Sequence, residues 1–581
     1  MTAKADVTQM VDSDSGYSMR RNGLFWKDPS DPEKPEMKIA GPFEIMAETR
    51  DAEGGNWGVL LRWWDNDDRE HEWPMPRSLL ASDGAEVRRI LLDGGLFVAS
   101  SQSARNKLTN YLASAKAKTR ARAVSQTGWH DGVFVLPEWT AGNSEERVIL
   151  QSAGAIDHAF RRQGTLEEWQ VEVAALAIGN SRLIAAICSA LAAPLLHVAG
   201  SESGGLHFRG SSSTGKTTAL NVGASAWGGG GIAGYIRSWR ATSNGLEAVA
   251  AAHCDALLCL DELGQVAAKE AGEVAYMLSN GSGKSRAARD GGGRRPAQWR
   301  LLFLSSGEIG LATKVAEDGR GRRLAAGQQV RVVDVPADAG AGHGIFEELH
   351  GHETGDALAR KLKQATTRHY GHAAPALIQQ IVQNPDWFGR EVRAFIEEFS
   401  GEACPTGADG QVQRVAQRFG LLAAAGEIAA KLEILPWPEG GAIEGCQRCF
   451  QAWLDSRGGP ESAEVRDGIA KVRAFVEAHG ESRFAPWQDD SHKTTINRAG
   501  FRRTTDGGGS EWFVFSEAWA KEICEGFDPT LVAKALADRG MLKPGKDGKR
   551  LQSRQRLPGF AGPVRCYHLT DALLAGGEAD D

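Results

Sequence analysis

A glycine-bounded loop near the middle of the chain constrains its fold more than any other feature. Residues 210–217 read Gly-Ser-Ser-Ser-Thr-Gly-Lys-Thr, the pattern of a phosphate-binding P-loop. Gly210 and Gly215 allow backbone dihedrals that a Cβ would forbid, so successive N–H groups can surround a phosphate chain. The preceding residues are compatible with a strand end, and a helix is expected to start near Lys216 with its positive end toward the same anion. The pattern predicts an α/β fold that binds a nucleoside triphosphate.

The side chains at the end of this loop provide the specific contacts. Lys216 places a positive charge on the β- and γ-phosphates, and the hydroxyl of Thr217 is a ligand for Mg²⁺. We therefore expect ATP and Mg²⁺ to bind here. The predicted nucleotide-binding residues in the loop are Gly210, Ser211, Ser212, Ser213, Thr214, Gly215, Lys216, Thr217 and Thr218.

An acidic pair follows an apolar run farther along the chain. Residues 256–260 read Ala-Leu-Leu-Cys-Leu, and Asp261 and Glu262 come next. The run predicts a buried strand, so its carboxylates should emerge at the carboxyl edge of a sheet, where ligands bind in α/β folds. We expect Asp261 to hold Mg²⁺ and Glu262 to orient and deprotonate the attacking water. The alternative is a solvated strand end without a catalytic role.

A third strand is predicted at Leu301-Leu302-Phe303-Leu304, and polar residues follow it. Polar residues in this place are typical of the γ-phosphate sensor in the additional-strand branch of P-loop ATPases. Ser306 is the first candidate for a catalytic sensor, and Glu308 is the second. A plain Ser-Gly turn would give the same sequence.

Arginines near two later elements are candidates for contacts with a nucleotide. Arg331 leads into an apolar strand, where ring ATPases place an arginine that reaches the γ-phosphate of a neighbouring subunit, and a planar cation there stabilises the charge of the transition state. Arg320, Arg322 and Arg323 are weaker candidates. Arg414 and Arg418 share one face of a predicted helix, and Arg414 is our candidate for a second sensor. In both places the alternative is an ordinary surface arginine.

A glycine-rich basic loop lies between the acidic pair and the third strand. Residues 280–295 include Lys284, Arg286 and Arg289 and few apolar side chains. In a ring, such a loop could form a hairpin that points into the pore and binds a phosphate backbone. A flexible surface loop is the alternative.

The chain divides into four regions by pattern. With 581 residues it is long enough for several domains. We expect a polar, partly disordered stretch at 1–35 and a β-rich domain at 36–150, with strands within 42–49, 57–64 and up to Trp73. The ATPase region spans 151–435, and its helices from 355 to 432 are broken near Pro375 and Pro385. A separate small domain occupies 436–581.

The last region has the pattern of a winged helix. Asp528-Pro529 begins a helix as cap and first residue, and a strand, a basic loop and another strand follow. The loop contains Lys549 and Arg550, which we expect to contact DNA phosphates. Many winged helices bind protein instead, so that alternative stays open.

Composition limits the class of protein. The net charge of −7 excludes a basic coat for nucleic acid, so contacts with DNA must use local patches or a channel made by assembly. Eight scattered cysteines indicate a reducing compartment, and no signal peptide is evident at the start. The uncharged stretch Leu183–Gly200 contains Pro194 and is expected to pack as a buried helix and strand rather than to span a membrane. We expect a cytoplasmic protein.

The motifs taken together resemble those of the bacterial family called domain of unknown function 927. The resemblance covers about residues 35 to 435 and is specific because of the order of its motifs. The matching stretches are Gly210–Thr218, Ser238–Glu247, Asp261-Glu262, Gly283–Ala287, Ser305–Glu308 and Ala326–Arg331.

The resemblance carries expectations for fold and assembly. Members occur in prophages and mobile elements, and some look like hexameric replicative helicases of the minichromosome-maintenance type. It implies an α/β fold of the AAA+ P-loop type with a helical lid, a β-rich N-terminal domain and a C-terminal winged helix. It also implies a hairpin near Lys284 and an arginine finger near Arg331. Ser306 stands where the family's sensor strand has Asn, and the N-terminal region has no zinc-ligand set.

These observations predict an ATP-dependent DNA helicase or translocase. It would act as a homo-oligomeric ring, a hexamer by resemblance, on single-stranded or forked DNA during replication of a phage or mobile element, with a possible replication partner protein. One alternative is an ATP-gated DNA-binding loader or regulator that does not unwind DNA. The other is an enzyme of the P-loop kinase type, with a small-molecule substrate and no response to DNA.

Overall fold

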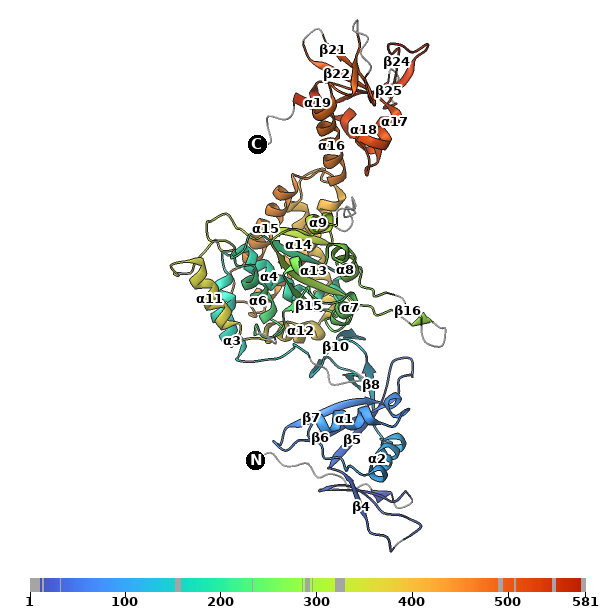
Figure 1. Ribbon diagram of the computed structural model, residues 1–581. Coiled ribbons are helices and arrows are strands. Elements are labelled where there is room, and N and C mark those ends of the chain that lie inside the picture. Colours follow the sequence, from blue (N-terminus) through green and yellow to red (C-terminus); the bar gives the residue numbers. More distant parts are fainter. Residues whose placement is uncertain are drawn as a thin grey trace. The chain divides into compact units, whose positions relative to one another are not determined.

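In the computed structural model, the described residues form two compact units (Figure 1). The first unit comprises Met1–Cys404 and Arg414–Ser456, and it extends beyond residue 435, where we expected the ATPase region to end. The second comprises Pro405–Gln413 and Arg457–Asp581. The described residues are 11–12, 15–31, 33–151, 158–231, 234–284, 286–287, 293–294, 296–318, 330–488, 495–505, 508–545 and 550–575.

The N-terminal region is built on an antiparallel meander, as the alternating pattern predicts. Strands β5 (Phe43–Arg50), β6 (Gly58–Trp64) and β7 (Glu70–Pro76) pair in sequence order, and β8 (Arg120–Val124) and β12 (Arg147–Leu150) extend the sheet in parallel. The inward side chains, Trp63 and Trp73 among them, pack in one apolar core with α1 (Ala85–Asp93) and α2 (Gln102–Ser114). Burying one face of each strand against helices explains the alternation in the sequence.

A second N-terminal sheet uses residues from the stretch 1–35. Its strands lie in the order β1-β2-β3-β4, all antiparallel. Leu24 and Ile39 from this sheet are fully buried in the same core as the meander. The sequence alone indicated little structure here because each strand is short. The bounds are β1 (Val11–Asp12), β2 (Tyr17–Arg20), β3 (Gly23–Trp26) and β4 (Met37–Ala40).

A small three-stranded sheet joins the N-terminal region to the central one. It contains β9 (Gly128–His130), β10 (Val133–Leu136) and β11 (Trp139–Ala141). The backbone N–H of Trp129 donates to the carboxylate of Asp255, 2.9 Å away, and the guanidinium of Arg300 pairs with both oxygens of the same carboxylate. Asp255 and Arg300 directly precede two strands of the central sheet, so this contact is at its amino edge.

The central sheet is parallel throughout and has the strand order β14-β15-β18-β13-β19. Strand β18 therefore lies between β13, which precedes the glycine loop, and β15, which ends in the acidic pair. Strands β13, β15 and β18 are almost fully buried, which explains the apolar runs of β15 and β18. The bounds are β13 (Gly204–Arg209), β14 (Arg237–Ser238), β15 (Ala256–Asp261), β18 (Leu301–Gly307) and β19 (Val332–Pro336).

Helices pack on this sheet. Those connecting its strands are α6 (Lys216–Ser225), α7 (Ser243–Ala251), α8 (Ala268–Asn280) and α9 (Leu311–Ala316). Between α8 and β18, the short strands β16 (Arg286–Ala287) and β17 (Gly293–Arg294) pair antiparallel. The basic loop thus contains the hairpin that we expected as one possibility.

The uncharged stretch Leu183–Gly200 forms two helices, so the prediction of a helix followed by a strand is wrong. The helices are α4 (Ser181–Ala192) and α5 (Leu195–Ala199), with Pro194 between them. Every residue of α4 is buried, and a helix that is buried on all sides loses the 3.6-residue pattern that would identify it. Among the described residues, no helix is both long and apolar enough to cross a membrane.

A helical region completes the first unit. Pro375 lies in the first turn of its helix and Pro385 is the first residue of the next, positions where a missing N–H costs nothing. The helices are α11 (Gly355–Ala365), α12 (Ala373–Gln383), α13 (Pro385–Ala403), α14 (Gly410–Lys431) and α15 (Gly441–Arg457), and α3 (Leu166–Trp169) precedes α4.

The second unit is a mixed sheet with helices. The predicted helix start is confirmed, because the carboxylate of Asp528 accepts from the N–H groups of Thr530 and Leu531 and Pro529 is the first residue of α18. The strand order is β20-β21-β22-β25-β23, with β24 also paired to β25. The bounds are α16 (Ala463–His479), β20 (Phe484–Pro486), β21 (Gly500–Thr504), β22 (Ser510–Phe515), α17 (Ser516–Ala518), α18 (Pro529–Asp538), β23 (Leu542–Lys543), β24 (Ser553–Gln555), β25 (Val564–Leu569) and α19 (Ala572–Ala575).

Candidate functional site

The glycine loop, Gly210–Thr217, lies at the carboxyl edge of the central sheet, between β13 and α6. Gly215 precedes the first turn of α6 with a φ of 91°, in the left-handed region that favours glycine. Gly210 does not have a positive φ, so our dihedral argument for it is wrong; the other left-handed residue of the loop is Ser213, with a φ of 65°. What Gly210 provides is space, since a Cβ there would lie 3.3 Å from the Cβ of Ala337.

The ammonium of Lys216 is held inside this loop. Its Nζ donates to the carbonyl oxygens of Gly210 and Ser211, at 2.8 and 2.6 Å, and the residue is 8% exposed. The side chains of Ser211, Ser212 and Ser213 are exposed at the outer side of the loop. The Nζ of Lys216 also lies 3.5 Å from the hydroxyl of Thr214. A cation that only neutral acceptors satisfy can exchange these bonds for contacts with a phosphate, because a charged acceptor makes the stronger hydrogen bond.

Three oxygen-bearing side chains converge beside the first turn of α6. The Thr217 hydroxyl lies 3.4 Å from each carboxylate oxygen of Asp261, at the end of β15. The hydroxyl of Ser306, at the end of β18, donates a hydrogen bond to the same carboxylate. The sheet order explains this meeting, since the carboxyl ends of neighbouring parallel strands lie side by side.

Glu262 is positioned by its backbone. Its φ of 64° is in the left-handed region, which a non-glycine residue rarely adopts, and its N–H donates to the Ser306 hydroxyl at 3.2 Å. Backbone conformations of this kind are found disproportionately at functional sites. Glu262 is partly exposed at the carboxyl edge of the sheet. The second sensor candidate, Glu308, is exposed just after the end of β18.

A buried hydrogen-bond chain that sequence reasoning missed lies beneath these residues. The Nε2 of His207 is 3.0 Å from the carbonyl oxygen of Ile309, which can only accept, so Nε2 carries the proton. Nδ1 therefore accepts from the Ser305 hydroxyl at 2.8 Å, and the Ser305 oxygen accepts from Trp239 Nε1 at 2.8 Å. Burial lowers the pKa of His207, which keeps the ring neutral. These hydrogen bonds connect β13 and β18 to Trp239, which directly follows β14, below the site. Trp239 was visible only as part of a family motif.

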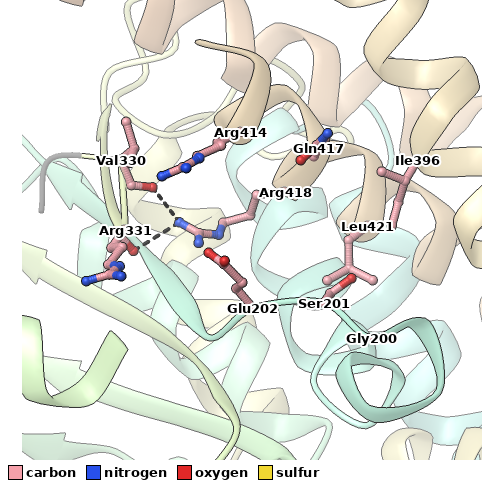
Figure 2. Close-up of a pocket in the computed structure, with 10 residues that line it drawn as sticks. All are labelled: Gly200, Ser201, Glu202, Val330, Arg331, Ile396, Arg414, Gln417, Arg418 and Leu421. Atoms are coloured by element: carbon pink, nitrogen blue, oxygen red, sulfur yellow. Dashed lines mark hydrogen bonds between the residues drawn. The ribbon is translucent and has the colours of Figure 1, made fainter. Parts of the chain in front are cut away.

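A pocket of about 310 Å³ lies at the opposite, amino edge of the same sheet and contains three arginines (Figure 2). Arg331 directly precedes β19, and Arg414 and Arg418 come from α14. The Arg331 guanidinium stands 5.3 Å from the ring centroid of Tyr276, which is 44% exposed. The remaining lining residues are Gly200, Ser201, Glu202, Val330, Ile396, Gln417 and Leu421.

The structure does not bring Arg331 or Arg414 to the glycine loop of the same chain. Strands β13 and β19 run parallel, with Gly205 beside Val332 and Arg209 beside Pro336. Arg331 comes before this paired stretch and the glycine loop comes after it. Since a strand rises about 3.3 Å per residue, the two edges are more than about 12 Å apart. In this structure neither arginine lies beside the glycine loop of its own chain.

Three of the predicted DNA-binding residues are described by the structure. Lys284 is exposed and its Nζ lies 3.6 Å from the Glu273 carboxylate, while Arg286 belongs to β16 in the hairpin. Arg550 is exposed in the second unit, just before β24. Arg289 and Lys549 are outside the described residues, as are Arg320, Arg322 and Arg323.

The residues around Asp261 fit a magnesium ion. Mg²⁺ prefers oxygen ligands and is usually held by one or two protein groups together with substrate phosphates and water. Thr217 and Asp261 present such oxygens next to the loop. The described residues contain no group of three or more His, Cys, Asp or Glu that could hold a metal without a substrate. All eight cysteines are described, and none forms a disulfide.

Comparisons with known proteins agree with the fold and with part of the sequence interpretation. The family model "Domain of unknown function (DUF927)" matches residues 17–298. No curated protein matches the chain. A solved structure described as "SCCmec type IV Cch - active helicase" is similar with a TM-score of 0.71 at 16% identity, over 96% of this chain and 99% of that chain. Over nearly its whole length, the chain therefore has a mixed α/β fold like that of this helicase, and its first half is similar to the DUF927 family.

Proposed function

We propose that the chain is an ATP-dependent DNA helicase or translocase that works as a homo-oligomeric ring. Three observations support the proposal: the cluster around the glycine loop, the arginine pocket at the other edge of the sheet, and the likeness to a solved helicase fold. The strand order, with β18 inserted between β13 and β15, is the arrangement that an AAA+ core requires. Helices α11 to α14 would then be its lid.

One relationship carries the proposal. Lys216, Asp261 and Glu262 are at the carboxyl edge of the sheet, and Arg331 and Arg414 are at the amino edge. A planar cation stabilises the transition state of phosphoryl transfer, and the two arginines proposed for this role do not lie at the glycine loop of their own chain. A second copy of the chain can supply this cation if its amino edge faces the first copy's carboxyl edge. That contact is heterologous, and repeating it closes a ring, for which six copies is our proposal.

The chain's own residues divide the chemistry at this interface. Lys216 would leave the carbonyls of Gly210 and Ser211 and bind the β- and γ-phosphates. Glu262 would accept the proton of the attacking water, and Ser306 would keep the carboxylate of Asp261 and the backbone of Glu262 in place. Arg331 and Arg414 of the neighbouring subunit would stabilise the charge on the transferred group. Mg²⁺, held by Thr217 and Asp261, would neutralise phosphate charge.

Contacts with DNA would come from two basic segments. Arg286 belongs to the β16–β17 hairpin, Lys284 precedes it, and Arg289 falls between its two strands in the sequence; in a ring we propose that these residues approach single-stranded DNA in the pore. In the second unit, α18 is followed by β23, β24 and β25, and we propose that these elements act as a winged helix, with Lys549 and Arg550, which precede β24 in the sequence, contacting phosphates. Since the net charge is −7, these local contacts would be the main source of affinity.

The biological setting follows by likeness. The similar solved structure is described as a helicase of an SCCmec element, and we propose that this chain likewise serves replication of a phage or mobile element, with a replication partner protein.

ATP hydrolysis in the presence of DNA tests the proposal. The variants Lys216→Ala and Glu262→Gln should each lose at least about 100-fold in DNA-stimulated turnover, because they remove phosphate binding and water activation. Undiminished turnover in both would contradict the assignment of the site. Strand separation of a forked substrate distinguishes a helicase from a loader, which would hydrolyse ATP on DNA without unwinding it.

Oligomerisation is tested by mixing subunits. Wild-type chains mixed with Arg331→Ala chains should lose more activity than the wild-type fraction alone predicts, because each variant subunit disables its neighbour. Activity that is strictly proportional to the wild-type fraction would contradict an arginine acting between subunits.

A further inference from the structure

The backbone that carries Arg331 is fastened to helix α14 by Arg418 (Figure 2). The guanidinium Nη1 donates to the carbonyl oxygens of Val330 and Arg331, at 2.7 and 3.0 Å, and Nη2 donates to the carbonyl oxygen of Ser203 at 3.2 Å. The Arg331 carbonyl also accepts from the N–H of Gly205 at 2.9 Å. One side chain thus joins α14 to the residues just before β19 and just before β13.

Because this guanidinium is charged, its hydrogen bonds are stronger than those of a neutral donor. Burial is the main reason that the pKa of Arg418 falls to about 10, with Glu202 opposing the decrease and Arg331 adding to it. The group remains protonated at neutral pH. Hydrogen bonds from a charged donor are shorter and stronger than neutral ones, and a planar guanidinium can reach several acceptors at once with a fixed spacing. A lysine could not make the same set of bonds.

The start of β13 is shaped to receive this side chain. At Gly204, a Cβ would lie 2.2 Å from Nη2 and 2.3 Å from Cζ of Arg418. Gly204 has no positive φ, so its backbone conformation is open to any residue. Glycine is needed there for the close approach of the guanidinium. Gly204 and Arg418, which are far apart in the sequence, therefore form this contact together.

Arg331 is consequently held at both its ends. Its carbonyl is fixed by Arg418 and Gly205, and its guanidinium stands over the exposed ring of Tyr276. The exposed Arg414 comes from the same helix as Arg418, one turn earlier. Movement of α14 would displace the backbone of Arg331 and the side chain of Arg414 together.

We propose that Arg418 is a positioning residue: it fixes Arg331 in the geometry that stabilises the transition state in the neighbouring subunit, and it couples that geometry to α14. The inference rests on the function proposed above. It assigns no contact with substrate to Arg418 itself. Because a displacement of about 1 Å in a group that contacts the reacting atoms costs about 10²-fold in rate, loss of the tie should reduce turnover strongly.

Mixed subunits separate positioning from general stability. In the control mixture, Arg331→Ala chains supply an intact glycine loop and Lys216→Ala chains supply an intact Arg331. This mixture should recover ATPase activity that neither chain has alone. Arg418→Met is then added to one partner at a time. On the Lys216→Ala chain, which supplies Arg331, it should reduce the recovered turnover about 10- to 100-fold with little change in KM. On the Arg331→Ala chain it should have less than about a twofold effect.

Each outcome is decisive. Equal losses in the two arms, or no loss in either, would overturn the inference while leaving the proposed function intact. A control mixture without recovered activity would instead contradict the arginine acting between subunits. Gly204→Ala, tested in the same two arms, keeps the charge but displaces the guanidinium, and it should reproduce the asymmetry. If Arg418→Met lowers the melting temperature too far to give folded protein, Gly204→Ala replaces it in the test. Arg418→Lys is a third variant for the same purpose.

Discussion

Ser306 donates a hydrogen bond from its hydroxyl to the carboxylate of Asp261 across two adjacent parallel strands. The same hydroxyl accepts from the N–H of Glu262 at 3.2 Å, and Ser306 is 1% exposed. One buried oxygen therefore orients both members of the acidic pair. This geometry favours a positioning role for Ser306 over direct contact with a γ-phosphate.

Ser306→Ala should reduce ATP turnover about 10- to 100-fold and leave ATP affinity within about threefold of wild type. The substitution leaves a partly buried N–H at Glu262 without its acceptor and removes a hydrogen bond from the Asp261 carboxylate. Steady-state ATPase and fluorescent-nucleotide binding measure the two quantities. Ser279→Ala is a matched control, because Ser279 is a buried serine on α8 that bonds only its own helix. A turnover loss no larger than that of the control would contradict the role.

Gly215→Ala should weaken nucleotide binding at least tenfold and destabilise the first unit by about 1–2 kcal/mol. An alanine at position 215 would have to adopt a φ of 91°, and its Cβ would lie 2.8 Å from Cγ1 of Ile345. Gly210→Ala is the contrasting variant, since its φ is not positive and its closest contact is 3.3 Å. Unfolding free energies should therefore differ between the two variants. Equal destabilisation would show that the left-handed conformation is not the cause.

Thr217→Ala should raise the Mg²⁺ concentration for half-maximal ATPase activity at least about tenfold, because it removes one of the two side chains that offer oxygen ligands to the metal. Thr217→Ser keeps the hydroxyl and should restore a near-normal requirement. Titration of Mg²⁺ at fixed ATP, after EDTA treatment, checks both. If the alanine and serine variants have the same Mg²⁺ requirement, the hydroxyl is not a metal ligand.

Lys284→Ala should lower the affinity for single-stranded DNA and reduce the slope of log K against log salt by about 0.7 for each lost phosphate contact. Lys284 is exposed at the base of the β16–β17 hairpin. Lys269→Ala makes the same change of charge at an exposed position on α8 and should leave the slope as in wild type. Fluorescence anisotropy at several salt concentrations gives both slopes, and identical slopes for the two variants would remove Lys284 from the DNA interface.

The stability of the first unit should fall in mild acid, in part through His253. Burial lowers the pKa of His253 to about 4, and its Nδ1 lies 2.7 Å from the carbonyl oxygen of Val249. Between the unfolded pKa of about 6.5 and pH 4, the unfolded chain binds a proton that the folded chain does not, so stability decreases as pH falls. The expected loss at pH 5 is about 2 kcal/mol.

His253→Phe keeps the packing against Tyr235 and Phe160 and removes the titration. The difference in unfolding free energy between pH 7 and pH 5, from urea denaturation, should therefore be about 2 kcal/mol smaller in the variant. Between pH 8 and pH 7 the two proteins should change alike. If the acid-induced loss is the same in both, another group accounts for it.

Local pattern determined much of the fold and of the candidate site. The apolar run 256–260 became β15 with the acidic pair at its end, and the glycine loop joined a strand to α6 as its sequence predicts. The sequence pattern likewise predicted the aromatic meander and the helix that Asp528 caps. In each case, neighbouring residues in the chain supply the whole signal, because side-chain alternation, glycine conformations and helix caps act within a few residues.

Where the signal was not local, the sequence was insufficient. The stretch Leu183–Gly200 is apolar on all sides, and its two helices follow from burial in the surrounding protein. The hydrogen bonds from Trp239 through Ser305 to His207 connect three segments that are far apart in the sequence. Parallel strands bring distant residues side by side at one edge, and only the register decides which residues meet.

The separation of the two arginines from the glycine loop is the clearest case. From the sequence, Arg331 and Arg414 were each a candidate for contact with a nucleotide. The neighbouring residues did not indicate whether that nucleotide is bound by the same chain or by another copy. The parallel direction of β13 and β19 places Arg331 at the edge opposite to Lys216, Arg414 lines the same pocket, and the guanidinium of Arg418 holds the backbone of Arg331 there. The sequence determined the residues available for chemistry, and strand direction in the tertiary structure decided that one chain cannot bring them all together.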